Sequence, residues 1–282
     1  MEQKREKMAV ALVTGASSGI GFYYAQELSR RGYNVLMVSN QEKELSEKAM
    51  IISQNTGAMH LDADTLENCA GKEKWVSTFY ADLSKQEAAH QLFDFCNGKG
   101  LEVEILVNNA GIFIFNDITD CSMQRIDLIL KLHVYTVTML CRLFGEKMAE
   151  RGHGYILNMS SLASHTPFPG ISLYSATKSY LRNMSMALRL ELKEKGVNVL
   201  TVSPGAVATD LYSLPRNLQR LGVRIKVIYR PEKLAQKALD KLFKGRREFV
   251  PGFVNRFFKP LYALMPDNVR LWIRKKTASF KK

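Results

Sequence analysis

Cysteine is scarce in this sequence, and long apolar runs free of charge are missing. Only 4 of the 282 residues are Cys, none of them in a CxxC pair, and no apolar secretory segment follows the charged start. This usage is typical of a reducing compartment, so we expect free thiols and a cytoplasmic chain. The most apolar stretch, 128–144, contains Lys131, His133 and Arg142. We therefore expect no membrane-spanning segment.

Acidic side chains become rare toward the C-terminus. Residues 1–210 hold 21 basic and 23 acidic side chains, a net charge of −2, whereas the last 72 residues hold 19 basic and 4 acidic ones, a net charge of +15. The whole chain, at +13 and 46% hydrophobic, has the composition of a globular protein rather than of a disordered one. The localised basic excess indicates an anionic partner for the C-terminal segment.

Strand-like apolar stretches alternate with helical patterns along most of the chain. The strands are expected at 8–13, 33–38, 76–80, 103–107, 154–159, 197–202 and 247–250, and the longest helices at 121–150 and 172–195. This alternation predicts an α/β fold, a doubly wound parallel sheet of about seven strands, in a single domain. Ser84 and Glu87 are expected to form a capping box for the next helix. The polar stretch 55–74 is expected to be a surface excursion.

A glycine-rich turn follows the first strand. TGASSGIG, residues 14–21, places Gly15, Gly19 and Gly21 where a strand gives way to a helix. Glycines there let the backbone approach a phosphate, and the helix N-terminus offers free N–H groups and a positive dipole end. The motif alone is as compatible with a plain turn. NNAG (108–111) and Asp82 follow two further strands of the same sheet. Their positions favour a dinucleotide site.

Four motifs in this order, TGASSGIG, NNAG, Tyr174-x-x-x-Lys178 and Ser203-Pro204-Gly205, resemble the short-chain dehydrogenase/reductase family. The resemblance implies a Rossmann core at 8–210 for cofactor binding and catalysis, with a substrate lid and basic extension at 211–282. The cofactor contacts that it implies are Gly15, Ser17, Ser18, Gly19, Ile20, Gly21, Ser39, Asn40, Asp82, Leu83, Asn109, Ala110, Gly111, Tyr174, Lys178, Pro204, Gly205 and Thr209.

The end of the second strand bears on the choice of cofactor. An acidic residue there would bond the ribose hydroxyls of NAD and repel a 2′-phosphate, but this chain has Ser39, Asn40 and Gln41. By resemblance, an Arg at the place of Asn40 would mark NADP, and it is also missing, with Lys43 a nearby cation in the sequence. We predict a preference for NADP(H), with NAD as the alternative, and no metal site.

Tyr174 and Lys178 lie on one face of an expected helix. The Lys charge favours the phenolate, so Tyr174 is suited to donate a proton to a carbonyl oxygen as a hydride arrives at the carbon. Ser161 is expected to supply a second hydrogen bond to that oxygen, and the family spacing favours it over Ser160.

Tyr229 and His133 are two further candidates for a catalytic role. A second YxxxK, Tyr229 and Lys233, contains Pro231, which suits the first turn of a helix and leaves Tyr229 outside it as a lid or packing residue. His133 stands where the family usually has an Asn that holds a relay water. A satisfied core His and a catalytic relay fit this position equally, and a relay His would titrate near neutrality.

The C-terminal segment combines its charge with apolar side chains. Residues 211–228 correspond to the family's substrate cap, and their character favours a lipophilic carbonyl compound over a sugar, although packing on the sheet explains it equally. Residues 253–282 mix aromatic and aliphatic side chains with Arg and Lys. This mixture suits a segment that lies peripherally on an anionic membrane, and the alternative is packing on the domain or on a partner subunit.

The predicted activity is NADP-dependent reduction of a ketone on a 3-oxoacyl, 3-ketosphinganine-like or steroid-like substrate. The alternative is a nucleotide-sensing binding protein whose catalytic residues are idle. A nucleic-acid site is not expected, because the basic tail contains no recognisable reading motif. The resemblance and the broad apolar faces of the two longest helices predict a homodimer or tetramer.

Overall fold

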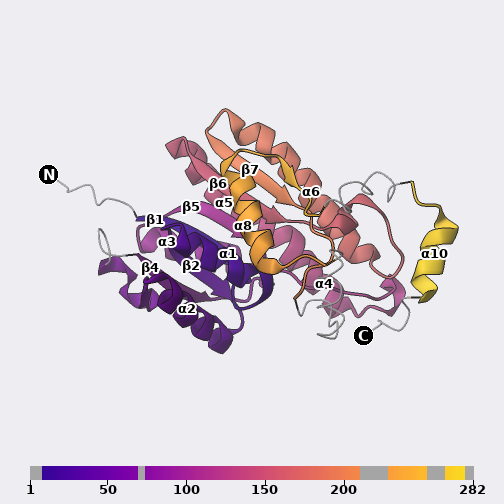
Figure 1. The fold of residues 1–282 in the computed structure, drawn as a ribbon, viewed down its shortest axis with the longest axis horizontal. Helices are drawn as coiled ribbons and strands as arrows, with labels where there is room; N and C mark the ends of the chain where they lie inside the picture. The colour runs from indigo at the N-terminus through magenta and orange to yellow at the C-terminus, as the bar shows by residue number, and fades with distance from the viewer. Residues whose placement is uncertain (1–7, 69–73, 210–227, 253–263, 277–282) are drawn as a thin grey trace.

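Strands rich in Val, Ile and Leu form the centre of the molecule. In the computed structural model, which describes residues 8–68, 74–209, 228–252 and 264–276, they make one eight-stranded sheet in the order β3-β4-β2-β1-β5-β6-β7-β8 (Figure 1). All neighbouring strands pair in parallel. The strands are β1 (Met8–Thr14), β2 (Asn34–Ser39), β3 (Met59–Leu61), β4 (Trp75–Tyr80), β5 (Leu101–Asn108), β6 (Gly154–Met159), β7 (Val197–Val202) and β8 (Glu248–Phe249). Each predicted strand is present, and β3 is an additional one.

The strand order reverses direction between β1 and β5. On one side of β1 the sheet continues through β2 and β4 to the edge strand β3, and the chain then returns to add β5, β6, β7 and β8 on the other side. In open α/β sheets, ligands bind beyond the carboxyl ends of the strands at such a switch point. Thr14 ends β1 and Asn108 ends β5, so the glycine turn and NNAG both begin there.

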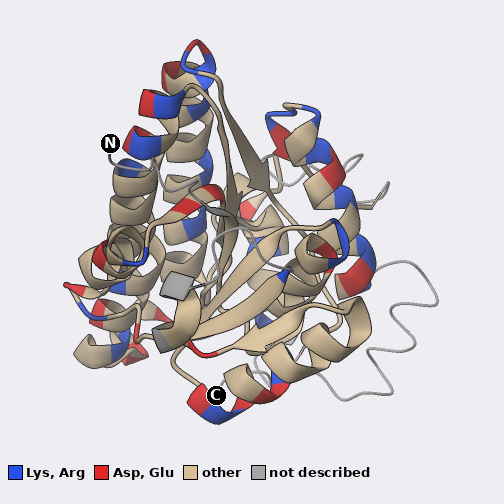
Figure 2. Ribbon diagram, turned by 90° about the vertical axis from the view of Figure 1, so that its left-hand side faces the viewer, with Lys and Arg blue, Asp and Glu red and all other residues tan. Residues whose placement is uncertain are grey.

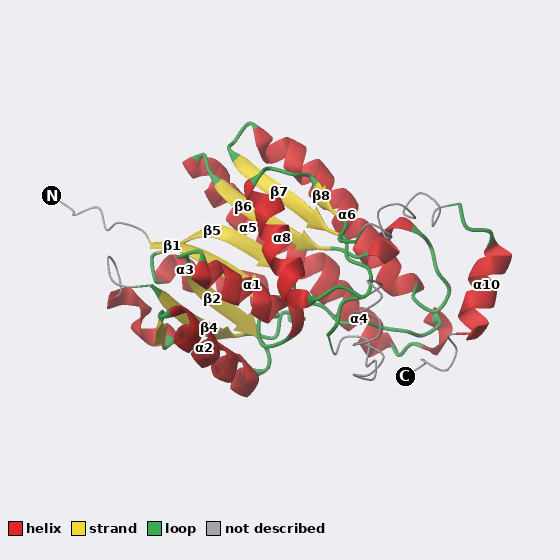
Figure 3. Ribbon diagram, viewed as in Figure 1, coloured by secondary structure: helices red, strands yellow, loops and turns green. Residues whose placement is uncertain are grey.

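Helices cover both faces of the sheet, and alternate residues of β1 face the two layers (Figure 3). Val10 and Leu12 belong to the core beneath α3 (Ala88–Gly98), α5 (Thr136–Arg151) and α6 (Ser172–Lys193). Ala11 and Val13 belong to the core beneath α1 (Gly19–Arg30), α2 (Glu42–Thr56) and α8 (Pro231–Phe243). Charged residues lie mostly on the outer helices and turns, whereas the strands are largely uncharged (Figure 2). This two-layer cover is the predicted doubly wound architecture.

Two local expectations need correction. The polar stretch 55–74 is not only a surface excursion, because it contains β3 and the 3₁₀ helix η1 (Ala63–Asn68), in which Leu66 is fully buried. Ser84 does not cap α3, which begins at Ala88. Its backbone N–H and its hydroxyl both donate to the Asp82 carboxylate, at 3.0 and 2.7 Å. Asp82 therefore closes a tight turn here in place of the capping box.

The long helix expected at 121–150 is divided into three parts. These are α4 (Met123–Leu130), a π-helical turn at Lys131–Tyr135, and α5. By length and composition alone, the run Met123–Arg151 could cross a membrane. In this fold α5 packs its Leu140, Phe144 and Met148 on the sheet, and His133 in the π turn is fully buried. The run is thus a core element of the domain.

Part of the predicted C-terminal region lies outside the described residues. This applies to 210–227, most of the expected lid, and to 253–263, which holds several of the tail aromatics. The described remainder includes α8, β8 and α10 (Asp267–Lys276). The single-domain organisation stays a prediction. Among described cysteines, Cys96, Cys121 and Cys141 are free thiols, as expected.

Candidate active site

A cavity of about 490 Å³ lies where the carboxyl ends of the central strands meet. It is lined by nearly all of the predicted cofactor residues, and only Gly21 and Gly205 are not part of its wall. Ser161, Tyr174 and Lys178 line the same cavity, whereas His133 lies behind its wall. Sequence analysis did not predict some further lining residues, namely Gln41, Ala81, Ser84, Ile112, Leu128, Leu132, Met159, Ser160 and Val207.

The glycine turn is held against the NNAG segment by hydrogen bonds. The hydroxyl of Thr14 accepts from the backbone N–H groups of Asn109 and Ala110, both at 3.0 Å, and the Asn109 amide donates to Thr14 O at 3.0 Å. A Cβ on Gly21 would lie 2.1 Å from Gly15 O and 2.5 Å from Asn109 Nδ2. Gly21 therefore permits the close approach of helix and turn, although it does not face the cavity.

The rim near the end of β2 has no carboxylate. The Ser39 hydroxyl, 6% exposed, lies 2.9 Å from the Ser17 hydroxyl and accepts from Gln41 N–H at 3.2 Å. Ser17 also donates to Gln41 Oε1 at 2.7 Å. The three polar side chains form one small network at the end of β2, so the place where an acidic residue would hold NAD is filled by neutral groups.

Tyr174 and Lys178 project from neighbouring turns of α6 into the cavity. The Lys178 ammonium donates to Met159 O at 2.9 Å and lies 5.8 Å from the centre of the Tyr174 ring. Burial lowers the pKa of Lys178 to about 7, because the charged form loses its hydration. Lys178 therefore changes its charge near neutral pH, a range in which an exposed Lys stays protonated.

The two serines after β6 are distinguished by their hydrogen bonds. The Ser160 hydroxyl donates to Lys178 O at 2.8 Å and is thereby committed to the backbone of α6. Ser161 Oγ accepts from Ala163 N–H at 3.2 Å, which leaves its own proton available for another acceptor. This difference favours Ser161 as the donor to a substrate oxygen.

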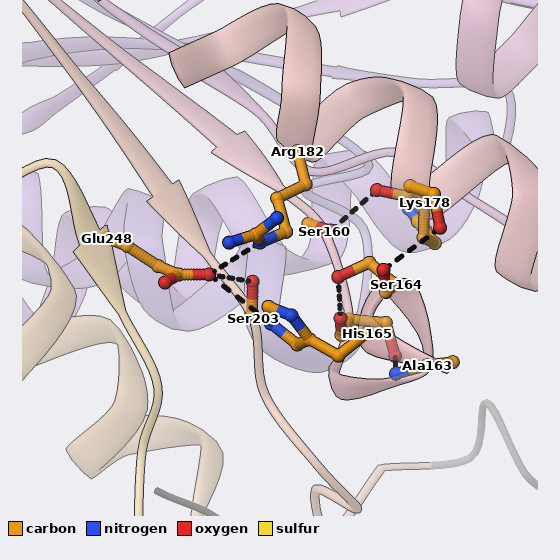
Figure 4. Close-up of polar contacts among 10 residues, drawn as sticks. Ser160, Ala163, Ser164, His165, Lys178, Arg182, Ser203 and Glu248 are labelled. Atoms are coloured by element: carbon orange, nitrogen blue, oxygen red, sulfur yellow. Dashed lines mark hydrogen bonds and ion pairs between the residues drawn. The ribbon is translucent and has the colours of Figure 1, made fainter. Parts of the chain in front are cut away.

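A polar cluster fixes the turn that carries Ser161. This turn includes the 3₁₀ helix η4 (Leu162–His165), and its last residue, His165, has Nε2 3.3 Å from Glu248 Oε1. Figure 4 shows the same Glu248 oxygen accepting from Arg182 Nε at 2.9 Å and from the Ser203 hydroxyl at 3.3 Å. Residues from η4, α6, β8 and the end of β7 thus meet at one carboxylate, whose side chain is 10% exposed. Sequence analysis gave no signal for this contact, because its members are distant along the chain.

His133 is hydrogen-bonded between the loop after β5 and helix α6. Its Nε2 accepts from Ile112 N–H at 3.0 Å, so Nδ1 carries the proton and donates to the Thr177 hydroxyl, also at 3.0 Å. Thr177 in turn donates to Tyr174 O at 2.9 Å. Burial, followed by the charge of Lys178, lowers the pKa of His133 well below its usual value. This lowered pKa does not match the titration near neutrality that a relay His would show, and both ring nitrogens are bonded to protein.

Apolar residues surround Tyr174 on the side away from the glycine turn. Tyr174, Ile114 and Ile129 form a small cluster of their own, joined by Ile112 and Phe113. The Phe113 ring meets the Tyr174 ring edge-on, with centroids 5.0 Å apart. Tyr229, the other candidate tyrosine, lies just before α8 and packs on the opposite core, as a packing residue would.

Comparisons with known proteins agree with this geometry. The family described as short chain dehydrogenase matches residues 9–217. The very-long-chain 3-oxoacyl-CoA reductase of Anas platyrhynchos is 33% identical over 215 residues, which cover 74% of this chain and 62% of that protein. The 17-beta-hydroxysteroid dehydrogenase type 3 of Danio rerio is 33% identical over 208 residues, 71% of this chain and 61% of that protein. The chain thus spans about three fifths of the length of these relatives.

A solved structure supports the same assignment at the level of the whole fold. The short-chain dehydrogenase from Sphingobium yanoikuyae in complex with NADPH superposes with a TM-score of 0.74 at 25% identity, covering 95% of each chain. Its likeness extends past residue 217, where the family match ends. From the strand order, the site geometry and these matches, the chain belongs to the short-chain dehydrogenase/reductase family.

Proposed function

We propose that this chain uses NADPH to reduce a ketone on a lipophilic substrate, with Tyr174 as the general acid. The observation that carries the proposal is a single cavity that contains both the glycine turn and the Tyr174, Lys178 and Ser161 side chains. The alternative, a binding protein with idle catalytic residues, has no support in this geometry, because all three side chains face one space.

The residues present fit a dinucleotide phosphate. Gly15 and Gly19 have positive φ angles of 65° and 54°, and the turn that they form opens α1, whose first backbone N–H groups are free to meet a phosphate. The neutral Ser39, Asn40 and Gln41 favour NADPH over NADH, because none of these three residues at the end of β2 is a carboxylate that would oppose the 2′-phosphate. When bound, NADPH supplies the hydride. The relative from Sphingobium yanoikuyae holds the same dinucleotide.

Proton transfer is the work of this chain's own residues. As a C–H bond forms at the carbonyl carbon, the oxygen takes the phenol proton of Tyr174, and the phenolate left behind is stabilised by the Lys178 ammonium. Ser161 donates a hydrogen bond to the same oxygen. A phenolate beside Lys178 favours its charged form, so the low pKa of about 7 set by burial rises once the negative charge develops.

The apolar part of the cavity wall bears on the substrate class. The cavity is lined in part by the apolar side chains of Ile112, Leu128, Leu132 and Met159, which would leave the hydroxyls of a sugar unpaired. The named relatives act, by their names, on 3-oxoacyl-CoA and on hydroxysteroids. A keto group on an acyl chain or on a steroid-like skeleton therefore suits this chain best.

His133 acts in this proposal as a positioning residue. It joins Ile112 of the loop after β5 to Thr177 of α6, and Thr177 bonds the backbone carbonyl of Tyr174. A neutral ring with two fixed hydrogen bonds holds this loop and α6 at a constant spacing. Holding a relay water would require one of these bonds to break.

Assembly as a homodimer or tetramer accompanies the proposal. Leu130 of α4 and Tyr180 and Leu190 of α6 are large apolar residues that are 41%, 41% and 68% exposed. Covering such residues is what a subunit contact would accomplish. Size-exclusion chromatography with light scattering measures the number of subunits directly.

The experiment that tests the activity is NADPH oxidation at 340 nm with a 3-oxoacyl thioester and a steroid ketone. Tyr174→Phe should lower kcat at least a thousandfold, because the proton donor is lost. Tyr180→Phe, on the same helix, is the matched control and should stay near wild type. Turnover that survives Tyr174→Phe contradicts the proposal. Tight NADPH binding without turnover of any ketone would support the binding-protein alternative.

A further inference from the structure

The C-terminal helix α10 turns its Arg side chains toward the protein and its apolar side chains outward. Arg270 and Arg274 face the protein, with side chains 14% and 12% exposed, and they pair with Asp267 at 2.9 Å and with Asp117 at 2.7 Å. Val269, Leu271 and Trp272 face outward and are 42%, 53% and 61% exposed. A helix on a protein surface normally buries its apolar side and exposes its cations. The outward side of α10 therefore has the character of a contact surface.

Arg274 fastens this helix to the active-site loops. Besides bonding Asp117, its guanidinium lies over the Phe115 ring, 5.4 Å from the centroid. Phe115 stacks on Phe113 at 6.3 Å, and Phe113 contacts Tyr174 at 5.0 Å. A continuous row of side chains thus connects α10 to the proposed general acid. Figure 1 shows α10 at one end of the molecule, far from α2 at the other.

The same guanidinium also touches the loop before α6. A Cβ on Gly170, whose φ is +86°, would lie 2.8 Å from Arg274 Nε. Arg274 is therefore packed between the loop that follows β5 and the loop that precedes α6. These two loops carry residues of the apolar cluster around Tyr174, so the inward side of α10 packs near the site and its outward surface faces away from it.

We propose that the outward surface of α10, formed by Val269, Leu271, Trp272 and Lys275 together with the neighbouring Ile118, docks on an anionic lipid bilayer. Ile118 follows Asp117 directly and is 53% exposed. Trp and Leu beside an exposed Lys match the interfacial region of a membrane, where apolar anchors and anionic headgroups lie together.

Charge decides between a bilayer and a second copy of this chain. The last 72 residues have a net charge of +15, so two such segments face to face would repel each other. An anionic membrane attracts the same segment, and each basic residue near its surface adds about 1 kcal/mol of binding. A lipid surface is therefore the occupant that fits both the apolar and the charged side chains.

The chain has only 2 Trp, and this makes docking measurable with the intact protein. Trp75 is fully buried, whereas Trp272 is 61% exposed. On mixing with vesicles of phosphatidylcholine and phosphatidylserine (7:3) at low salt, the emission of Trp272 should shift to shorter wavelength and become quenched by brominated lipid. Trp272→Phe should abolish both changes. Vesicles of phosphatidylcholine alone, or 0.5 M NaCl, should weaken binding at least tenfold.

A matched pair of double variants assigns the effect to α10. Val269→Ser with Leu271→Ser keeps the Trp272 reporter and should lower the vesicle partition coefficient at least tenfold. Met50→Ser with Ile51→Ser removes apolar residues of similar exposure, 43% and 37%, from α2 and should leave it unchanged. Equal binding by both pairs, or no wild-type binding to anionic vesicles at low salt, overturns the proposal. So does a change of oligomeric state in the α10 pair without lipid, because the surface would then be a subunit contact.

Delivery of substrate from the bilayer rests on the proposed function, whereas docking itself does not. With a ketone dissolved in the vesicles, the α10 pair should raise the apparent KM at least tenfold. With a short water-soluble ketone, the same variant should keep the wild-type kcat and KM. Vesicle binding in the absence of any ketone reductase activity would remove the proposed function and leave the docking surface standing.

Discussion

Lys178 carries a stability cost that should depend on pH. Its side chain is 5% exposed, and burial lowers its pKa to about 7, whereas a Lys in the unfolded chain keeps a pKa near 10.4. Its ammonium donates one hydrogen bond, to Met159 O. Lys178→Met keeps most of the buried volume and removes the charge, so the variant should unfold less readily than the wild type.

The sign and size of the effect follow from proton linkage. Between about pH 7 and pH 10.4 the unfolded chain binds a proton that the folded chain has released, so wild-type stability rises with pH by up to ~1.4 kcal/mol per unit. Below pH 7 both states are protonated, and the cost is fully present, on the order of 5 kcal/mol. From pH 7 to pH 9 the advantage of Lys178→Met should therefore shrink by about 2 kcal/mol, because Lys178 is still half protonated in the folded chain at pH 7.

The assay is urea unfolding of the cofactor-free protein at pH 7, 8 and 9, followed by circular dichroism. Lys193→Met, which replaces an exposed Lys on the same helix, is the control and should show no such trend. Loss of the hydrogen bond to Met159 O changes the free energy of unfolding of Lys178→Met by an amount that does not depend on pH. The test is therefore how the difference in unfolding free energy between variant and wild type changes with pH. A difference between wild type and Lys178→Met that stays constant from pH 7 to pH 9 would refute the reasoning.

Three further predictions concern the cofactor side and His133. Ser39→Asp should lower the NADPH/NADH ratio of kcat/KM at least tenfold by charge repulsion, and Ser39→Asn should not; equal ratios in both variants would contradict the role of charge. Gly21→Ala should weaken NADPH binding at least tenfold in a fluorescence titration, because its Cβ meets backbone at 2.1 Å, whereas Gly98→Ala enters open space and should bind normally. His133→Asn retains an acceptor for Ile112 N–H and should keep more kcat than His133→Ala, and the wild-type pH–rate profile should have no limb from His133 between pH 6 and 8. A limb that disappears in His133→Asn would restore the relay hypothesis.

Local patterns were sufficient for the sheet and for the motifs on its carboxyl edge. Apolar runs such as 103–107 predict a buried strand without knowledge of the fold, and glycines such as Gly15 mark the turn that follows one. The edge strand β3 was missed because three residues, with Met59 exposed, carry no periodic signal. The Asp82 turn was missed because Ser84 and Glu87 match a capping box equally well in sequence.

Contacts between distant segments could not be predicted in the same way. Glu248 meets Arg182, in the middle of α6, only because β8 is added beside β7. Arg274 meets Asp117 across 157 positions of the chain. In both cases the charge pattern of the sequence allows many partners, and the tertiary fold selects one.

The protonation states of His133 and Lys178 are coupled. Both are buried basic groups, Lys178 in the pocket wall and His133 behind it, and the charge of Lys178 is one of the two causes that keep His133 neutral. With Ile112 and Thr177 occupying the two nitrogens, His133 has no way to gain a proton without losing a bond. Among the described residues that line the pocket, Lys178 is therefore the one that carries a positive charge when it is protonated. A phenolate at Tyr174 draws its stabilisation from that ammonium.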